Sequence, residues 1–339
     1  LAARCNCTTL RLDAGDEMQG TLPSNLAYGR TTIEALDLMG IQAAAVGNHD
    51  FDWSADTLRA RMRDSDYPWV AANIFDSTTG KRPDWVMPWR MVRAGKYQVA
   101  VVGFITSETK QIVAPQNIAR LTFGAGYQPI RDAVEEARSA KPDLLVLLAH
   151  AGGRCDSISC AGEIFDLADS LPAGSVDLIV SGHSHTLLDT ERNGIPIVQA
   201  RSSGTAVGVV DVIKTADGGR KIDVDVRTVW VDQVTPDSAL SALVARAVRT
   251  TDSLANRVIT DIALPLPRTG NQYPLGNLIA DAFRNVLRTD VALINNGGVR
   301  ADVAAGRLTY GQLFTAMPFQ NQAVTVTLTG KQLREVAEA

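Results

Sequence analysis

Short apolar runs alternate with amphipathic stretches over the first 230 residues, and this alternation predicts an α/β domain. Strands are expected at residues 9–13, 42–46, 69–72, 98–104, 143–149, 177–180, 196–200, 206–212 and 221–231. Helices are expected between several of these strands, at residues 31–39, 55–63, 129–140 and 162–170. The strands after Pro196 follow one another without helices, so we expect them to pair antiparallel.

The pattern changes after about residue 234. A helix with one polar face is predicted over residues 235–256, because Thr235-Pro236-Asp237 is typical of a helix start. Beyond it we expect a helix near residues 275–287 and strands near residues 291–294 and 323–328. The chain is therefore expected to divide into a first domain over residues 1–233, a linker over 234–266 and a second domain over 267–339.

Composition narrows the class of protein. The 339 residues are 45% hydrophobic and 21% charged, which is typical of a globular protein. The net charge of -4 provides no basic field for a nucleic-acid backbone, so duplex nucleic acid is not expected as a partner. The longest apolar runs, at residues 99–105 and 144–149, are far shorter than the roughly 20 residues of a transmembrane helix. The sequence starts without a Met or a signal peptide, so a signal is expected to be absent or already removed.

Four cysteines are present, and their spacing is not that of a zinc ribbon. The spacing of Cys155 and Cys160 permits a small disulfide-closed loop, but two free thiols are an equally good interpretation. Cys5 and Cys7 are too close to bridge each other without strain, so we expect no bond between them.

Histidine indicates where the chemistry lies, because each His follows the end of an apolar run. The four are His49, His150, His183 and His185. A further run, at residues 10–13, leads into Asp16. Loops at the carboxyl ends of strands converge on one crevice in an open α/β sheet, so these segments are expected to share a site.

The side chains in these loops suit a metal site. Imidazoles with one carboxylate and one amide oxygen bind zinc, manganese, iron or nickel rather than calcium, and we interpret the set as a dinuclear site. A single isolated His more often caps a strand or satisfies a core hydrogen bond. Four of four at Gly-flanked strand ends favour the metal site.

The motifs themselves resemble those of calcineurin-like metallophosphoesterases. They are DAGDEMQG at residues 13–20, GNHDFD at 47–52, HAG at 150–152 and GHSH at 182–185. Further along, NNGGVR at 295–300, MPF at 317–319 and LTG at 328–330 resemble the C-terminal domain of 5′-nucleotidases, in particular the bacterial periplasmic 5′-nucleotidase and UDP-sugar hydrolase group. The resemblance implies a two-sheet αββα sandwich, a helical linker and a smaller α/β C-terminal domain that is expected to be incomplete.

The resemblance also implies residue roles. Asp16 is expected to bridge two divalent ions, Zn, Mn or similar, with one ion completed by Asn48, His150 and His183 and the other bound by His185. A hydroxide between the ions would attack phosphorus without a phosphoenzyme. His49 would stabilise the phosphoryl oxygens or protonate the leaving group, with Asp52 orienting its ring. Another interpretation is that Asp52 caps the helix that begins near Ser54, and the two roles do not exclude each other.

In the second domain, the resemblance implies a nucleotide-binding surface. The residues concerned are Asn295, Gly297, Gly298, Arg300, Phe319 and, on a poorer local match, Arg268. Arg300 would bind phosphate oxygens and Phe319 would stack on the base. The implied activity is release of phosphate from nucleoside 5′-monophosphates by a periplasmic or extracellular enzyme, with surface anchoring left open.

One departure from the family pattern leaves alternatives open. The family's first Asp-x-His ligand pair has no counterpart before Asp16, so we expect the chain to be part of a longer protein and the second ion to have fewer ligands. Cleavage of 2′,3′-cyclic nucleotides, of nucleotide sugars or of a sulfur substrate would use the same loops. A non-catalytic protein that binds a single metal is the remaining alternative, against which His49 and Asp52 argue.

Overall fold

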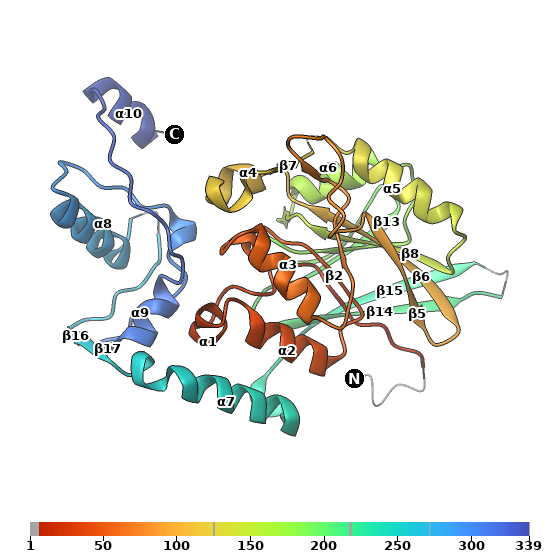
Figure 1. Cartoon of the computed structure of the whole chain (residues 1–339), viewed down its shortest axis with the longest axis horizontal. Coiled ribbons are helices and arrows are strands. Elements are labelled where there is room, and N and C mark those ends of the chain that lie inside the picture. The colour runs from red at the N-terminus through yellow and green to blue at the C-terminus, as the bar shows by residue number, and fades with distance from the viewer. Residues whose placement is uncertain (1–6, 125, 217–218, 271, 339) are drawn as a thin grey trace. The chain divides into compact units, whose positions relative to one another are not determined.

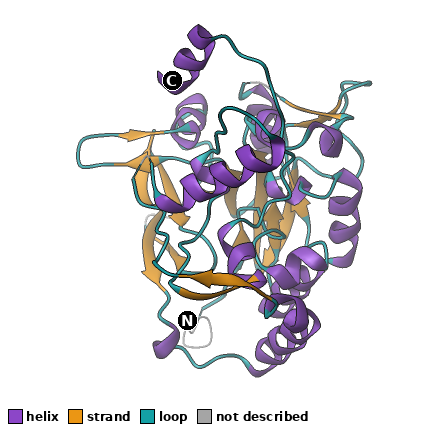
Figure 2. Ribbon diagram, turned by 90° about the vertical axis from the view of Figure 1, so that its left-hand side faces the viewer, coloured by secondary structure: helices purple, strands orange, loops and turns teal. Residues whose placement is uncertain are grey.

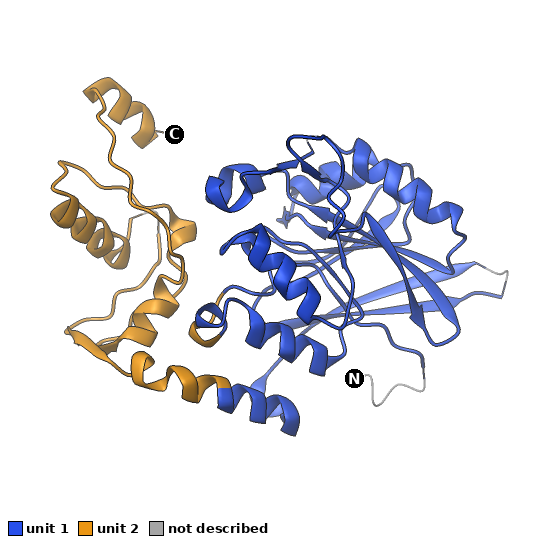
Figure 3. Cartoon of the chain, in the orientation of Figure 1, with its two compact units in different colours: residues 1–19, 24–246 blue, residues 20–23, 247–339 orange. Residues whose placement is uncertain are grey.

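The computed structural model describes residues 7–124, 126–216, 219–270 and 272–338. The chain forms two compact units: residues 1–19 with 24–246, and residues 20–23 with 247–339 (Figure 3). The division falls inside helix α7, Ser238–Ala255. The expectation that Cys5 and Cys7 form no bond stays a prediction, because Cys5 lies outside the described residues.

Within the described part of the first unit, six strands form one sheet in the order β12-β13-β11-β8-β6-β5. Their bounds are β5 Trp89–Ala94, β6 Tyr97–Ile105, β8 Leu144–His150, β11 Leu178–Ser181, β12 Leu187–Arg192 and β13 Ile195–Ala200. The central strands are parallel, as in the pairing of Ile105 with His150 and of Ser181 with Ala149. The edge strands β5 and β12 run antiparallel to their neighbours.

A second, smaller sheet is parallel and has the order β1-β2-β3, with bounds β1 Leu12–Asp13, β2 Ala43–Ala45 and β3 Trp69–Val70. The remaining strands of the unit pair two by two: β4 Ile74–Asp76 with β7 Leu121–Phe123, β9 Arg154–Cys155 with β10 Cys160–Ala161, and β14 Ala206–Lys214 with β15 Arg220–Thr228. The last pair is antiparallel, which confirms that part of the prediction for the strands after Pro196.

Helices cover the outer faces of the two sheets, as Figures 1 and 2 show. Their bounds are α1 Leu22–Leu26, α2 Arg30–Met39, α3 Ala55–Asp64, α4 Thr109–Ile112, α5 Gln128–Ser139 and α6 Glu163–Ser170, with short 3-10 turns at η2 His49–Phe51, η3 Pro115–Ile118 and η4 Val231–Gln233. Ser54 caps the start of α3, where its hydroxyl accepts the Thr57 N–H, and Gly40 follows the last residue of α2 with a φ of 69°, which favours glycine.

Three buried clusters hold the layers together. Alanines and valines of the small sheet, such as Ala43 and Val70, pack against Val101 and Val146 on the inner face of the large sheet. The outer face of the large sheet packs on α5 and α6, and the outer face of the small sheet packs on α2 and α3. The first unit is therefore an αββα sandwich, which confirms the predicted fold class.

The second unit contains α8 Pro274–Leu287, η5 Asn296–Gly298, α9 Tyr310–Ala316, α10 Gly330–Glu338 and the antiparallel pair of β16 Val258–Ile262 with β17 Gly306–Thr309. Its core is formed by residues such as Leu275, Ile279, Val299 and Leu308. None of the helices in the described residues is long and apolar enough to cross a membrane.

Two strand predictions in this unit are wrong. Residues 291–294 and 323–328 have no strand, although the first segment is a continuous apolar run and apolar side chains alternate in the second. Leu293 is 65% exposed and Val324 is 78% exposed, so these segments bury little against a neighbour. An alternating pattern shows which face a strand could bury, but a strand forms only with a hydrogen-bonded partner.

Candidate functional site

The strand ends converge as predicted. Asp16 follows β1 and Asn48 follows β2 in the small sheet, whereas His150 ends β8 and His183 follows β11 in the large sheet. Because β8 and β11 are parallel neighbours, their carboxyl ends place the two imidazole rings side by side, with centroids 5.1 Å apart. The site therefore lies where the carboxyl edges of the two packed sheets meet.

The donor atoms in this site are close enough to share one ion. Ligand atoms of Asp16, His150 and His183 all lie within 4.8 Å of one another. The His150 Nε2 is 3.0 Å from Asp16 Oδ2 and 3.1 Å from Asn48 Oδ1. Among the described residues, His185 is not part of this group; it is exposed and stands two positions further along the same loop.

The hydrogen-bond chemistry of His150 fits a metal. Its Nδ1 lies 2.8 Å from the Ala14 carbonyl oxygen and can only donate there, which we infer fixes the proton of a neutral ring on Nδ1. In that neutral ring the Nε2 lone pair would face two oxygen acceptors, Asp16 Oδ2 and Asn48 Oδ1, whereas the imidazolium that Asp16 favours would donate a proton to them. A cation among the three would turn this repulsion into attraction. Metal-binding histidines usually donate their second ring N–H to a carbonyl in this way.

Burial and neighbouring charges shift the pKa values of the residues at the site. Although burial opposes ionisation, the neighbouring His150 and His49 lower the pKa of Asp16 below its usual value. Burial disfavours charge on His150 too, but the Asp16 carboxylate outweighs it and raises the pKa of His150. Burial, followed by the nearby His150, lowers the pKa of His183. The ionised Asp16 carboxylate and the neutral form favoured at His183 are states that ligate a metal, whereas a metal at His150 would have to displace the proton that Asp16 favours there.

His49 and Asp52 form a pair beside these ligands. The His49 Nδ1 lies 3.0 Å and 3.1 Å from the two Asp52 carboxylate oxygens, and the His49 backbone N–H donates to Asp16 Oδ1 at 2.7 Å. Burial raises the pKa of Asp52, and the hydrogen bond from His49 opposes that rise. The Asn117 side chain donates to the Asp52 carbonyl at 2.7 Å and fixes this turn from η3.

The alternative role for Asp52 as a helix cap is not observed, because Ser54 caps α3. Ser54 itself has a φ of 121°, which is unusual for a residue with a side chain. Three of the predicted ligands also adopt left-handed backbone conformations, with φ of 63° at Asp16, 73° at His183 and 57° at His185. Such conformations cost free energy and persist where the surrounding structure imposes them.

Gly47 lets the two loops of the small sheet touch. A Cβ at this position would lie 2.2 Å from Asp16 Oδ1 and 2.3 Å from the Asp16 backbone nitrogen, closer than atoms can approach. Any larger residue at 47 would displace the Asp16 carboxylate from the site. This is why the sequence has Gly directly before Asn48.

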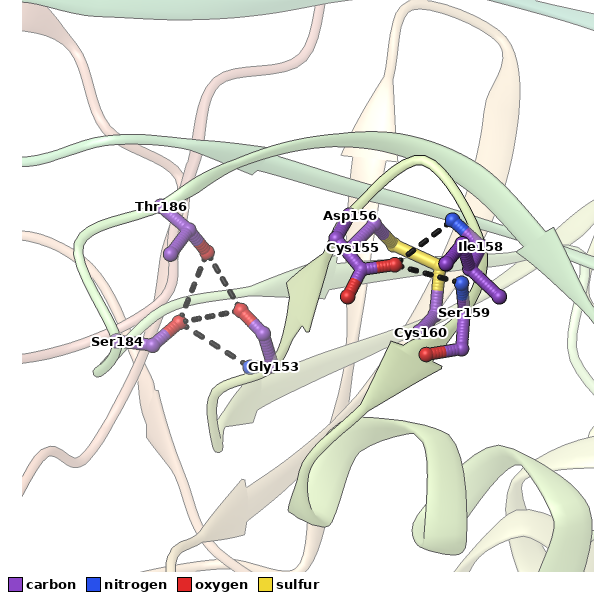
Figure 4. The surroundings of a disulfide bond; sticks show 8 residues. All are labelled: Gly153, Cys155, Asp156, Ile158, Ser159, Cys160, Ser184 and Thr186. Atoms are coloured by element: carbon purple, nitrogen blue, oxygen red, sulfur yellow. Dashed lines mark hydrogen bonds between the residues drawn. A yellow bond between two sulfur atoms is a disulfide. The ribbon is translucent and has the colours of Figure 1, made fainter.

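Sequence reasoning missed a polar cluster that joins the two histidine loops of the large sheet (Figure 4). Ser184 stands between His183 and His185 in the sequence, and its hydroxyl contacts the backbone nitrogen and the carbonyl oxygen of Gly153. The Thr186 hydroxyl donates to the same Gly153 carbonyl at 2.6 Å. The Gln199 side chain on β13 donates to both hydroxyls. The only signal in the sequence is a small hydroxyl residue between two histidines.

Cys155 and Cys160 form a disulfide, which settles the choice that the sequence left open (Figure 4). The bond joins β9 to β10 and closes a short hairpin that begins directly after Gly153. Inside the hairpin the Asp156 carboxylate accepts the N–H groups of Ile158 and Ser159 at 2.7 Å and 2.8 Å. The hairpin thus has a defined turn directly beyond the His150 loop.

In the second unit, the residues predicted to bind a nucleotide lie close together. The Arg300 guanidinium carbon is 5.3 Å from the centre of the Phe319 ring, and the Arg268 side chain donates to the Arg300 carbonyl at 3.3 Å. Asn295 precedes the turn η5, and its Oδ1 would lie 2.9 Å from a Cβ at Gly298, so glycine is needed there. Gly297 is exposed in the same turn and its carbonyl accepts from Arg300 at 3.3 Å.

A two-sheet sandwich whose strand ends carry converging imidazole, carboxylate and amide groups defines an α/β protein with a candidate metal site. Comparison with known proteins identifies the family. The calcineurin-like phosphoesterase model matches residues 12–187, more than half of the chain, and the 5′-nucleotidase C-terminal domain model matches residues 250–339. The chain belongs to the calcineurin-like phosphoesterase family.

Individual relatives are more distant. Endonuclease YhcR of Bacillus subtilis is 30% identical over 98% of this chain, and a 5′-nucleotidase of Vibrio parahaemolyticus is 28% identical over 96% of it. The solved 5′-nucleotidase precursor of Thermus thermophilus is similar with a TM-score of 0.81 and 26% identity over 94% of the chain. The chain spans 28% of the first relative and 66% of each of the other two.

Proposed function

We propose that the protein is a divalent-metal-dependent hydrolase of nucleotide phosphoesters, and that it releases phosphate from nucleoside 5′-monophosphates. In this proposal residues 1–233 carry the catalytic site, 234–266 link the domains and 267–339 recognise the nucleoside. The observation that carries the proposal is the convergence of Asp16 Oδ2 and Asn48 Oδ1 on His150 Nε2, at 3.0 Å and 3.1 Å. Family membership and the relatives named 5′-nucleotidase support the same reaction class.

The proposed ligands are Asp16, Asn48, His150 and His183 for one ion, with Asp16 and His185 contributing to a second. Zn, Mn or a similar ion, when bound, would supply positive charge for the phosphoryl oxygens and lower the pKa of a water. Asp16 has two carboxylate oxygens and can face both ions, and the His183 ring beside His150 closes one side of the site.

His49 is the proposed group that assists the leaving oxygen. Its Nδ1 is hydrogen bonded to Asp52, so Nε2 is the ring atom that we assign to a substrate oxygen. Protonated, it would stabilise a charged phosphoryl oxygen or give its Nε2 proton to the departing ribose oxygen. Asp52 holds the ring in one orientation.

The proposed nucleoside contacts come from the second unit. Arg300 offers a planar fork for phosphate oxygens, and Phe319 offers a ring on which any base could stack. Asn295 would hydrogen bond a base edge, the Gly297-Gly298 turn would let the ligand approach the backbone, and Arg268 would add a second cation. Export to the periplasm or the outside of the cell stays a prediction, supported by the Cys155–Cys160 disulfide.

A substrate panel tests the proposal. Hydrolysis of AMP, followed as free phosphate, should require added Mn²⁺ or Zn²⁺ after dialysis against a chelator. It should exceed hydrolysis of 2′,3′-cyclic AMP to a nucleoside monophosphate, of UDP-glucose to UMP and glucose 1-phosphate, and of a thiosulfate ester to sulfate, each followed by its own product. A single-stranded oligonucleotide belongs in the panel, because one relative is named an endonuclease. Faster cleavage of a cyclic or polymeric diester would show that the activity is that of a phosphodiesterase and not of a phosphomonoesterase. Metal binding without turnover of any substrate would favour a non-catalytic binding protein.

A further inference from the structure

Asp50 is a buried carboxylate that neither the proposed ligand set nor the proposed dyad uses. Its side chain lies in η2, between His49 and Phe51, and is fully buried. In the described part of the chain it forms no ion pair with a Lys or Arg. A buried carboxylate without a basic partner needs hydrogen-bond donors of another kind.

Four backbone N–H groups supply those donors. The Asp50 Oδ2 accepts from Gly47 at 2.8 Å and from Asp16 at 3.2 Å. The Asp50 Oδ1 accepts from Glu17 at 3.0 Å and from Met18 at 3.3 Å. Both oxygens are therefore used, and each accepts two N–H groups.

These donors come from two loops that are distant in the sequence. Gly47 directly precedes Asn48 in the loop after β2, whereas residues 16–18 form the loop after β1. A carboxylate that only shaped its own turn would accept N–H groups from its own loop alone. Asp50 instead ties the loop carrying Asp16 to the loop carrying Asn48, and it does so at the point where the two backbones touch at Gly47.

We propose that Asp50 is a positioning residue, which holds the Asp16 and Asn48 loops in the register that a metal ion requires. The inference rests on the proposed function, because it assigns a purpose to the geometry of the proposed ligands. Asp50 acts only through backbone groups and touches neither metal nor substrate. Removing a group that orients metal ligands typically lowers metal affinity by about 10- to 100-fold.

The four N–H contacts require the two acceptor oxygens of a carboxylate at position 50. An amide at position 50 has one acceptor oxygen, so its NH₂ group would face two of the four backbone N–H groups. Asp50→Asn keeps the size and shape of the side chain and removes half of the contacts. Asp50→Glu keeps two acceptors but places them one methylene further out, so residues 16–18 would have to move.

The test measures divalent-metal affinity by isothermal titration calorimetry with Mn²⁺ on metal-free protein, without substrate. Asp177→Asn is the matched control, because the Asp177 carboxylate accepts the Leu145 N–H at 2.7 Å at the opposite ends of β8 and β11. Asp50→Asn should bind Mn²⁺ about 10- to 100-fold more weakly. Asp177→Asn should stay within about twofold of the natural protein, although both variants lose thermal stability. Wild-type affinity in Asp50→Asn would overturn the inference.

A second variant keeps the test decisive if Asp50→Asn does not fold. Asp50→Glu should bind more weakly than the natural protein and shift the visible absorption of bound Co²⁺, whereas Asp177→Glu should not. In that case unchanged affinity and an unchanged Co²⁺ spectrum in Asp50→Glu would overturn the inference. A natural protein that binds Mn²⁺ but hydrolyses no nucleotide would contradict the proposed function alone, and one that binds no divalent ion would contradict both.

Discussion

The Ser184 hydroxyl lies 3.1 Å from the backbone nitrogen of Gly153 and 3.0 Å from the Gly153 carbonyl oxygen, so one side chain contacts both polar backbone groups of a residue 31 positions away. A Cβ at the neighbouring Gly152 would lie 2.4 Å from the Ser184 Cβ. Because Ser184 separates His183 from His185, this contact fixes the GHSH loop (residues 182–185) against the loop that follows His150.

Ser184→Ala should therefore weaken the site as well as the fold. The Gly153 N–H would lose its partner, at a cost of about 1–3 kcal/mol in the free energy of unfolding. Metal affinity should fall too, because His183 would lose its support. Urea unfolding and Mn²⁺ titration measure the two effects. Ser170→Ala is the control, since its hydroxyl donates to the Leu167 carbonyl at 2.7 Å within α6. Equal metal affinity in both variants would show that Ser184 has only a structural role.

Much of the fold could be predicted from the sequence because buried parallel strands leave continuous apolar runs. The strands β6, β8 and β11 were predicted within two residues at each end for this reason. The edge strands β5 and β12 were not predicted, since charged residues such as Arg90 and Glu191 interrupt their apolar pattern and face solvent. Pairing between distant segments leaves no local signal, which also explains the two wrong strands in the second unit.

The convergence of Asp16, Asn48, His150 and His183 could be predicted because strand ends in an α/β sheet meet at one edge. The supporting residues could not. Asp50 and Ser184 act through backbone groups of loops about 30 residues away, and no spacing in the sequence reveals such a contact. His185 followed the same strand-end pattern, yet its position in the loop leaves it exposed.

His49→Ala should lower turnover of AMP by about 10²- to 10⁴-fold, because a general acid or electrostatic stabiliser is removed. Metal content should stay that of the natural protein, since His49 pairs with Asp52 and is not a proposed ligand. Steady-state kinetics and elemental analysis of the same sample check both statements. Loss of metal would reassign His49 as a ligand. Asp52→Asn, which keeps the ring but weakens its orientation, should lower turnover less.

Phe319→Ala should raise the KM for AMP while leaving hydrolysis of a small aryl phosphate unchanged. The lost stacking free energy of about 1–3 kcal/mol corresponds to roughly 5- to 150-fold in affinity. Phe314→Ala is a suitable control, because Phe314 contacts Tyr310 within α9 at a ring distance of 6.5 Å. A similar loss on both substrates would point to a structural role for Phe319 in supporting Arg300.

Replacing both Cys155 and Cys160 by Ser should lower the free energy of unfolding by about 2 kcal/mol, the chain-entropy value for so short a loop. The change lies in an exposed hairpin outside the layers of the sandwich, so AMP turnover at 25 °C should change less than for Ser184→Ala. Denaturant unfolding under oxidising and reducing conditions measures the effect, since reductant should destabilise the natural protein alone. Titratable thiols at Cys155 and Cys160 in protein purified without reductant would contradict the disulfide.

The most direct measurement is metal content set beside phosphate release, in the natural protein and in His183→Ala. His183 is less buried than His150, so replacing it by Ala removes an imidazole without leaving a cavity in the core. The natural protein should retain a divalent ion through gel filtration, lose it together with AMP hydrolysis on dialysis against a chelator, and regain both with Mn²⁺ or Zn²⁺. His183→Ala should retain less metal and release less phosphate. Undiminished AMP hydrolysis by the metal-free protein would contradict the account.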